Sequence, residues 1–346
     1  MRIVVDAMGS DRHPGPDVEG AVLAAREFGE TIVLVGDQQR VSAELARHDT
    51  SGLPIEVVHA AEHVTMEDKP GVVGRAKPDS SMHVGMRLVA AGEADAFVTA
   101  GNTGAALSIA TLHTLKRIEG VHRPALGTIL QLAGRSMILL DVGANTDTRA
   151  EWLAQYGVMG SVYAACALGL PNPRVALVSN GEEAGKGTQL VQDAAELLRT
   201  IGVNFTGNAE PKEVLGGAVD VAVMDGFTGN VMIKTMEATG DLIFRVVREE
   251  LVADTRSKLG GLLVKPAFRR VYRQFDPFEI GGVPLLGVNG VVIIGHGRSN
   301  AYAVKNAIRQ ARDAVRGGIV AAIREGLAHA SDSTEAFASG GEVEGQ

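Results

Sequence analysis

Cysteine is nearly absent from this sequence of 346 residues, in which Cys166 is the only one. One thiol excludes a disulfide within the chain and any zinc or iron–sulfur site that is built from several cysteines. We therefore expect the protein to work in a reducing compartment such as the cytoplasm. Because Cys166 stands among alanines and leucines in the run YAACALGL, we expect a buried, small apolar side chain and not a nucleophile.

Positive charge and long apolar runs are scarce as well. Lys and Arg number 33 against 41 Asp and Glu, which gives a net charge of −8 at pH 7. An acidic chain without a basic, aromatic-rich platform is not expected to bind nucleic acid. No run of about 18 apolar residues is present for a membrane-spanning helix, and the opening MRIVVDAMGS is too short and too soon acidic for a signal peptide. The sequence predicts a cytoplasmic protein.

The chain does contain a regular alternation of short apolar runs with helical patterns. The runs that predict strands are RIVVDA, TIVLVG, IEVVHA, ADAFVTA, LGTILQL, SMILLDV, RVALVS, VDVAVMD and GVVIIG. Helices are predicted over residues 17–28, 80–91, 103–114, 149–168, 186–201, 230–253 and 300–324. Several strands are apolar at successive residues, as parallel strands are when both faces are covered. The pattern predicts an α/β fold, a three-layer αβα arrangement around a mostly parallel, doubly wound sheet.

This fold is expected to form one large catalytic domain over residues 1–328. The remaining residues, 329–346, are small, acidic and aperiodic. We predict that this tail is disordered and has no catalytic role.

Six polar loops, each containing glycine, follow the predicted strands. They are DAMGSD (6–11), TAGNTGA (99–105), DVGANTD (141–147), SNGEEAGKG (179–187), DGFTGN (225–230) and GHGRSN (295–300). In open parallel sheets, ligands bind beyond the carboxyl ends of the strands. We therefore expect the six loops to form one polar site that is rimmed by backbone N–H groups.

The loop SNGEEAGKG has the strand before it and the helix after it that are typical of a phosphate-binding loop. However, three residues separate Gly181 from Gly185 where a Walker A loop has four, and Gly187 stands where the magnesium-binding hydroxyl belongs. Two acidic residues within the loop would also repel a triphosphate. We predict that Lys186, at the opening of a helix, binds a small anion; the alternative is an exposed lysine in a first helical turn.

A second basic segment, MEDKPGVVGRAKPDSSM (66–82), precedes another predicted helix. Its two prolines predict an extended loop that folds over a site. Its cations and the serine pair at the helix start are a predicted phosphate clamp, formed by Lys69, Arg75, Lys77, Ser80 and Ser81. The alternative is a solvated basic loop with an ordinary helix cap.

His296 lies in the GHG motif after the last predicted strand, where active-site loops belong. The flanking glycines leave the imidazole accessible. The position suits a general base or a hydrogen-bonding group, and a structural role is the alternative.

A basic segment, RSKLGGLLVKPAFRRVYR (256–273), contrasts with the acidic chain around it, with six cationic residues and no acidic one. A helix to about Asp254, a Gly-Gly/Lys-Pro turn and a second basic helix predict a protruding hairpin over about residues 230–276. The hairpin is expected to dock on an anionic membrane or an acidic partner, or to be buried in a dimer interface. The predicted docking residues are Lys258, Leu259, Leu262, Leu263, Lys265, Phe268, Arg269, Arg270 and Arg273.

Taken in order, the motifs resemble those of the bacterial phosphate acyltransferase family, the acyl-ACP:phosphate transacylases (PlsX). The matching stretches include DAMGSD, DKPGVVGRAKPDSSM, ADAFVTAGNTGA, LLDVGANTD, NGEEAGKG, VDVAVMDGFTGNVMIKT and PLLGVNGVVIIGHGRS. Each is weak alone, but together they are collinear over residues 1 to about 325.

The resemblance implies transfer of a long-chain acyl group from acyl carrier protein to inorganic phosphate. The acyl phosphate would serve phospholipid synthesis by way of phosphatidic acid, with a membrane glycerol-3-phosphate acyltransferase as a possible partner. It also implies a fold similar to those of isocitrate and isopropylmalate dehydrogenases and phosphate acetyltransferases, a homodimer, and peripheral membrane association. It implies no metal and no cofactor.

Such chemistry needs an anion clamp and donors to the developing oxyanion, because phosphate is itself the nucleophile. The predicted catalytic residues are Lys186, His296, Asn230 and Asn102. The other predicted substrate-binding residues are Asp6, Thr103, Asn145, Glu182, Asp225 and Lys234.

Two alternatives remain open at this point. A metal- and NAD-dependent dehydrogenase of the same fold would use Asp141, Asp147 and Asp225 for Mg²⁺, although no dinucleotide fingerprint follows a strand. A non-catalytic adaptor that docks on acyl carrier protein or a membrane would explain the hairpin but not the six polar loops.

Overall fold

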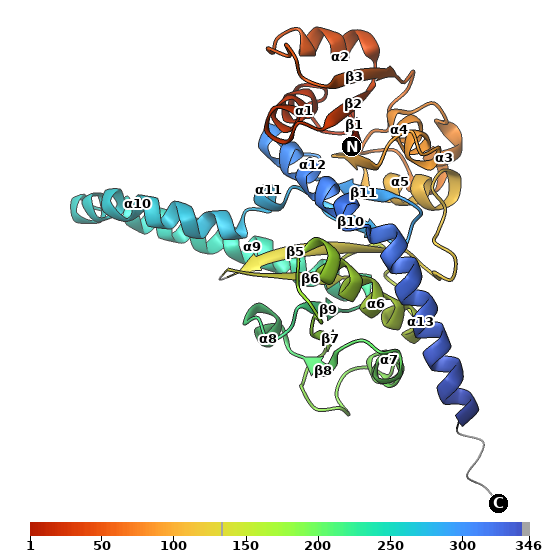
Figure 1. Cartoon of the computed structure of the whole chain (residues 1–346). Helices are drawn as coiled ribbons and strands as arrows, with labels where there is room; N and C mark the ends of the chain where they lie inside the picture. Colours follow the sequence, from red (N-terminus) through yellow and green to blue (C-terminus); the bar gives the residue numbers. More distant parts are fainter. Residues whose placement is uncertain (133, 341–346) are drawn as a thin grey trace, which may run out of the picture.

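A single eleven-stranded sheet organises the part of the chain that the structure describes. A computed structural model describes residues 1–132 and 134–340. The strand order across the sheet is β3-β2-β1-β4-β11-β10-β5-β6-β9-β7-β8 (Figure 1). The strands are β1 Arg2–Asp6, β2 Thr31–Gly36, β3 Ile55–His59, β4 Ala96–Thr99, β5 Ala125–Leu132, β6 Arg135–Leu140, β7 Val175–Val178, β8 Phe205–Ala209, β9 Val221–Val223, β10 Val283–Leu286 and β11 Val291–Ile294. Neighbours are parallel, except that β10 pairs antiparallel with β11 and β5, and β5 with β6.

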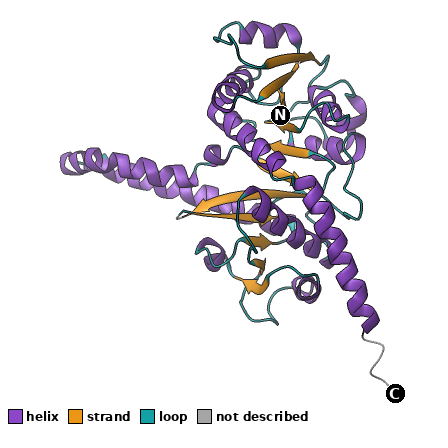
Figure 2. Cartoon of the chain, in the orientation of Figure 1, coloured by secondary structure: helices purple, strands orange, loops and turns teal. Residues whose placement is uncertain are grey.

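Helices cover both faces of this sheet (Figure 2). They are α1 Gly15–Phe28, α2 Gln38–Leu45, α3 Pro70–Ala76, α4 Ser81–Ala90, α5 Thr103–Ser108, η1 Ile109–His113, α6 Ala150–Ala167, α7 Gln189–Thr200, α8 Pro211–Leu215, α9 Gly226–Leu251, α10 Thr255–Phe275, α11 Pro277–Ile280, α12 Ala301–Arg316 and α13 Ile319–Gly340.

Alternation along the strands explains the two covered faces. In β1, Ile3 and Val5 join one hydrophobic core while Val4 joins another on the opposite face. The strand β6 behaves alike, with Ile138 in the first core and Met137 in a third. Strands buried on both faces need apolar residues at successive positions, as the sequence has. The predicted three-layer, mostly parallel α/β fold is confirmed.

The protruding hairpin is present, but its turn is not where the glycines and proline predicted it. The long helices α9 and α10 lie side by side and project from the body of the molecule (Figure 1). The chain reverses at residues 252–254, and Asp254 caps α10 by accepting hydrogen bonds from the Ser257 backbone N–H and hydroxyl. Gly260, Gly261 and Pro266 lie inside α10. A Cβ at Gly261 would lie 3.4 Å from Leu251, which is ordinary van der Waals contact, so the residue faces α9 without requiring glycine.

Other differences from the expected elements have local causes. The predicted helix 300–324 is two helices, because Gly318 adopts a positive φ of 63° between α12 and α13. The helix α13 continues to Gly340, where the sequence predicted an irregular tail from residue 329; residues 341–346 lie outside the described part. Cys166 is exposed near the end of α6, so its predicted burial is wrong.

Candidate active site

A cavity of about 700 Å³ lies where α9, α11, β5 and the loop after β11 meet. Four of the six polar loops reach it, those after β4, β6, β9 and β11. They contribute Thr103, Gly143, Asn230 and His296 to its wall. Lys234 on α9 also lines it. The cavity therefore unites four of the predicted site residues: Thr103, Asn230, Lys234 and His296.

A chain of charged side chains crosses the polar end of the cavity. Lys234 Nζ lies 3.0 Å from Glu237 Oε2, and Glu237 Oε1 lies 4.0 Å from His296 Nε2. Burial lowers the pKa of His296 below the ordinary histidine value; Glu237 opposes this shift, while Lys234 and Arg298 reinforce it. His296 is therefore neutral at pH 7 and able to accept a proton.

Two charged residues in this group were not assigned a role from the sequence. Glu237 lies three residues after Lys234, on the same face of α9. This helical spacing could have identified Glu237 as a partner of Lys234. Arg298 lies in the GHGRSN loop and lines the cavity, with its guanidinium 5.9 Å from the Phe278 ring. Its position two residues after His296 in the GHGRSN motif could have identified Arg298 as a site residue.

Thr103 is the first residue of α5, and Asn230 is the fifth residue of α9. The N–H groups that open α9 already donate to Asn145 and Asp225. The Asn230 amide donates to the Val142 carbonyl at 3.3 Å. One of its two amide hydrogens is engaged in this way. Asp225 is the N-cap of α9 and accepts from the N–H groups of Phe227 and Thr228, which fixes the first turn that carries Asn230.

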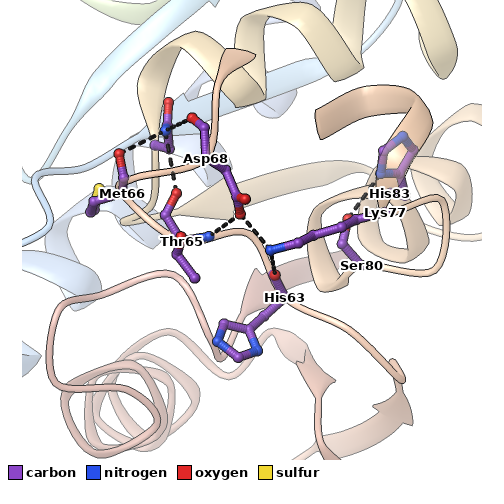
Figure 3. A network of polar contacts seen from close by, with 8 residues as sticks. His63, Thr65, Met66, Asp68, Lys77, Ser80 and His83 are labelled. Atoms are coloured by element: carbon purple, nitrogen blue, oxygen red, sulfur yellow. Dashed lines mark hydrogen bonds and ion pairs between the residues drawn. The ribbon is translucent and has the colours of Figure 1, made fainter. Parts of the chain in front are cut away.

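Asn102 and Lys77 hold the loop formed by residues 65–68; Figure 3 labels Lys77 and the loop residues Thr65, Met66 and Asp68. The Asn102 amide donates to the carbonyls of Thr65, Met66 and Asp68, while its oxygen caps α5. Lys77 Nζ lies 2.5 Å from Asp68 Oδ2 and also donates to the His63 carbonyl. Both side chains are thus engaged within the protein, and neither lines the cavity.

Other members of the predicted set, Asp6, Asn145, Ser80 and Ser81, are buried or partly buried and do not line the cavity. Asp6 accepts hydrogen bonds from the Thr99 hydroxyl and the Met8 N–H, and burial raises its pKa. The Asn145 amide donates to Pro124, Asp141 and Tyr156. Ser80 and Ser81 are fully buried at the start of α4, where the Ser80 hydroxyl pairs with His83 at 2.9 Å (Figure 3).

The loop that first suggested phosphate binding lies outside the cavity. Lys186 is exposed, and Glu182 pairs with Lys212 at 3.4 Å. The Asn208 amide ties this loop to β8 through the carbonyls of Glu183 and Lys186. The basic residues Lys69 and Arg75 are exposed on and beside α3 and do not line the cavity either.

The docking residues predicted on the hairpin lie on α10, which buries none of its residues. Leu263 is 82% exposed and Leu262 71%. Cationic side chains accompany them along the same helix, and Arg273 Nε lies 3.7 Å from Glu279. The hairpin therefore presents apolar and positive groups together.

Neither a cluster of metal-binding side chains nor a membrane-spanning helix is found in residues 1–132 and 134–340. No group of three or more His, Cys, Asp and Glu side chains in that part of the chain could hold a metal ion. Nor does any helix there have the length and apolar character to cross a membrane.

A family model described as "Fatty acid synthesis protein" matches residues 1–322. The chain is 44% identical over 319 residues to the phosphate acyltransferase of Geobacter sulfurreducens, covering 92% of each chain. It is 47% identical over 343 residues to the phosphate acyltransferase of an Anaeromyxobacter species, covering 99% of this chain and 94% of the relative.

Solved structures of other enzymes share the fold. The EutD phosphotransacetylase from Staphylococcus aureus superimposes with a TM-score of 0.57 at 18% identity, covering 90% of this chain and 94% of that one. A phosphotransacetylase from Streptococcus pyogenes gives a TM-score of 0.58 at 17% identity, with the same shares covered.

Proposed function

Because the chain belongs to the fatty acid synthesis protein family of phosphate acyltransferases, we propose that its acyl donor is the thioester of acyl carrier protein. A long-chain acyl group passes from this thioester to inorganic phosphate and gives an acyl phosphate. This product feeds phosphatidic acid synthesis, where a membrane glycerol-3-phosphate acyltransferase consumes it. The observation that carries the proposal is the polar end of the cavity, where Lys234, Arg298 and a neutral His296 meet.

The proposed step needs no nucleophile from the protein. A phosphate oxygen attacks the thioester carbonyl carbon, a C–O bond forms, and the C–S bond breaks as its electron pair leaves on the thiolate. Lys234 and Arg298 hold the phosphate dianion, and the Asn230 amide with the N-terminus of α5 stabilises the oxyanion. His296 takes the phosphate proton and returns it to the thiolate.

The direct test supplies palmitoyl acyl carrier protein and labelled phosphate to the purified chain. We expect labelled acyl phosphate, trapped as a hydroxamate, and release of the carrier thiol that depends on phosphate. Thiol release without phosphate, or no acyl phosphate from any donor, would contradict the proposal.

Lys234→Ala tests the phosphate contact. A hydrogen bond to a charged group contributes about 1.5–3 kcal/mol, so the KM for phosphate should rise about ten- to hundredfold. The matched control is Lys212→Ala, which removes a lysine that is also paired with glutamate but lies outside the cavity. If both changes altered the KM for phosphate equally, Lys234 would not contact the phosphate.

The basic hairpin is proposed to bind an anionic membrane surface. Its exposed Leu259, Leu262 and Leu263 stand beside Lys258 and Lys265, a combination that favours shallow insertion between acidic headgroups. We expect the protein to sediment with phosphatidylglycerol vesicles and Leu263→Asp to weaken this binding at least fivefold, roughly the effect of removing one buried leucine. Wild-type protein that stays in the supernatant at low salt would exclude direct binding.

A homodimer is proposed from a second exposed apolar surface. Phe227, Val231, Leu242 and Val246 lie on the face of α9 that turns away from the cavity, and Phe227 is 63% exposed. Sedimentation velocity at micromolar concentration should give twice the chain mass. A monomer under these conditions would contradict the dimer.

A further inference from the structure

Charged side chains gather at one end of the cavity, at Lys234, Glu237 and His296. Much of the remaining wall is apolar and comes from several elements: Leu107 of α5, Leu130 of β5, Ile233 and Met236 of α9, and Phe278 and Ile280 of α11. Asp241, Gln274 and Asp276 also line it. Its volume of about 700 Å³ is within the range of sites that enclose a small molecule. We call this space the α9 cleft.

One face of α9 forms a wall along the whole length of the cleft. Asn230, Ile233, Glu237, Gly240 and Phe244 all line it, at spacings of three and four residues. At a rise of 1.5 Å per residue, the distance from Asn230 to Phe244 is about 21 Å. The cleft therefore leads from the predicted reacting atoms to a point well inside the hairpin base.

An aromatic cluster marks the far end. The Phe244 ring lies 5.0 Å from that of Tyr272 and 6.1 Å from that of Phe275. All three residues line the cleft and join α9 to α10 at the base of the hairpin. An apolar ligand that follows α9 would end its path against these rings.

Gly240 leaves space in the middle of this wall. A Cβ at this position would meet no atom within 4 Å, although the residue lines the cleft. Glycine inside a helix destabilises it by about 1 kcal/mol relative to alanine. The packing of the protein therefore does not require glycine at this position.

We propose that the α9 cleft holds the fatty acyl chain of the donor and that Gly240 keeps its passage open. This inference rests on the proposed acyl transfer. The thioester carbonyl lies between Asn230 and His296, and the hydrocarbon follows α9 past Gly240 to the aromatic cluster. With C–C bonds of about 1.5 Å, an extended sixteen-carbon chain spans roughly 19 Å, which matches the length of the wall.

The test is Gly240→Leu, assayed with hexanoyl and palmitoyl donors on acyl carrier protein. A six-carbon chain ends before Gly240, whereas a sixteen-carbon chain passes it. Overfilling a packed site costs about 1–3 kcal/mol, so we expect kcat/KM for the palmitoyl donor to fall about tenfold or more, with the hexanoyl rate within about twofold of wild type. Gly240→Ala should give an intermediate loss and a melting temperature no lower than wild type.

Thr239→Leu is the matched control, because this exposed neighbour on α9 receives the same leucine outside the cleft. Its activity with both donors should equal that of wild type. Equal losses with hexanoyl and palmitoyl donors in Gly240→Leu, or no loss with either, would overturn the proposal. A changed oligomeric state with an unchanged chain-length profile would assign the cleft to a second copy of the chain. Failure of wild type to make acyl phosphate from any donor would instead refute the proposed function.

Discussion

Replacing His296 with asparagine is expected to lower kcat about a hundredfold, because a positioned general base typically contributes 10²–10⁴-fold. Asparagine keeps much of the imidazole's size and hydrogen bonding but cannot take a proton. The measurement is the rate of acyl phosphate formation at saturating phosphate and donor. His122→Asn, an exposed histidine outside the cavity, provides the control and should keep the wild-type rate.

The pH profile separates proton transfer from simple positioning. The pKa of His296 lies below the ordinary value of 6.5, mainly because of burial. The neutral form therefore persists to lower pH, and the acid limb that His296 causes in kcat/KM should lie below pH 6.5. His296→Asn should abolish this limb and leave the limb due to phosphate's own ionisation. If His296→Asn kept both the wild-type rate and the wild-type acid limb of the pH profile, His296 would have no role in catalysis.

Glu237 sets the position of that limb. Its negative charge raises the pKa of His296 against the effect of burial. Glu237→Gln removes the charge, so the acid limb should move to lower pH. This direction distinguishes an electrostatic partner of His296 from a residue that only packs against it.

The order of strands decided which of the predicted loops form the site, and the sequence does not encode that order in any local pattern. The apolar runs predicted nine strands correctly, most of them buried, but β8 (FTGNA) and β10 (VPLL) were missed. The loops after β6 and β11 belong to strands separated by only β10 and β5, and both line the cavity. The loop after β7 is two strands beyond β6, which explains why Lys186 lies outside.

Competition between local signals explains the error in the hairpin. Two glycines and a proline predict a turn at residues 260–266, yet these residues continue α10. Capping by Asp254 starts the helix at Thr255, before the glycines, and packing against α9 outweighs the weak helix propensity. Likewise, the polar residues Asn102 and Asn145 were found by their motifs. Only the structure shows that their amides bond to the protein's own carbonyls and side chains.

Asp141 is expected to be the residue whose loss most disturbs the site without touching substrate. It is fully buried directly after β6, and its Oδ1 accepts from the N–H groups of Leu126, Gly143 and Ala144. Its Oδ2 accepts from the N–H and amide of Asn145 at 2.8 and 3.1 Å. This loop also packs against the start of α9, where a Cβ at Gly229 would collide with the Asp141 carbonyl.

Asp141→Ala would leave these buried donors without their acceptor. Each unsatisfied buried group costs about 1–3 kcal/mol, so the free energy of unfolding should fall by roughly 3–5 kcal/mol. Urea denaturation of the two proteins measures the difference. Asp147→Ala, on the exposed part of the same loop, should change it by less than about 0.5 kcal/mol.

Asp141→Asn keeps the prediction testable if the alanine variant does not fold. Asparagine retains one oxygen for the three backbone donors but turns an NH₂ group toward the donors of Asn145. We expect a smaller loss of stability than in Asp141→Ala, together with a lower kcat, because the strained loop moves Gly143 and the first turn of α9 that carries Asn230. Full stability and full activity in this variant would show that the carboxylate does not organise the loop, and Asn230 would then owe its position to the Asp225 cap alone.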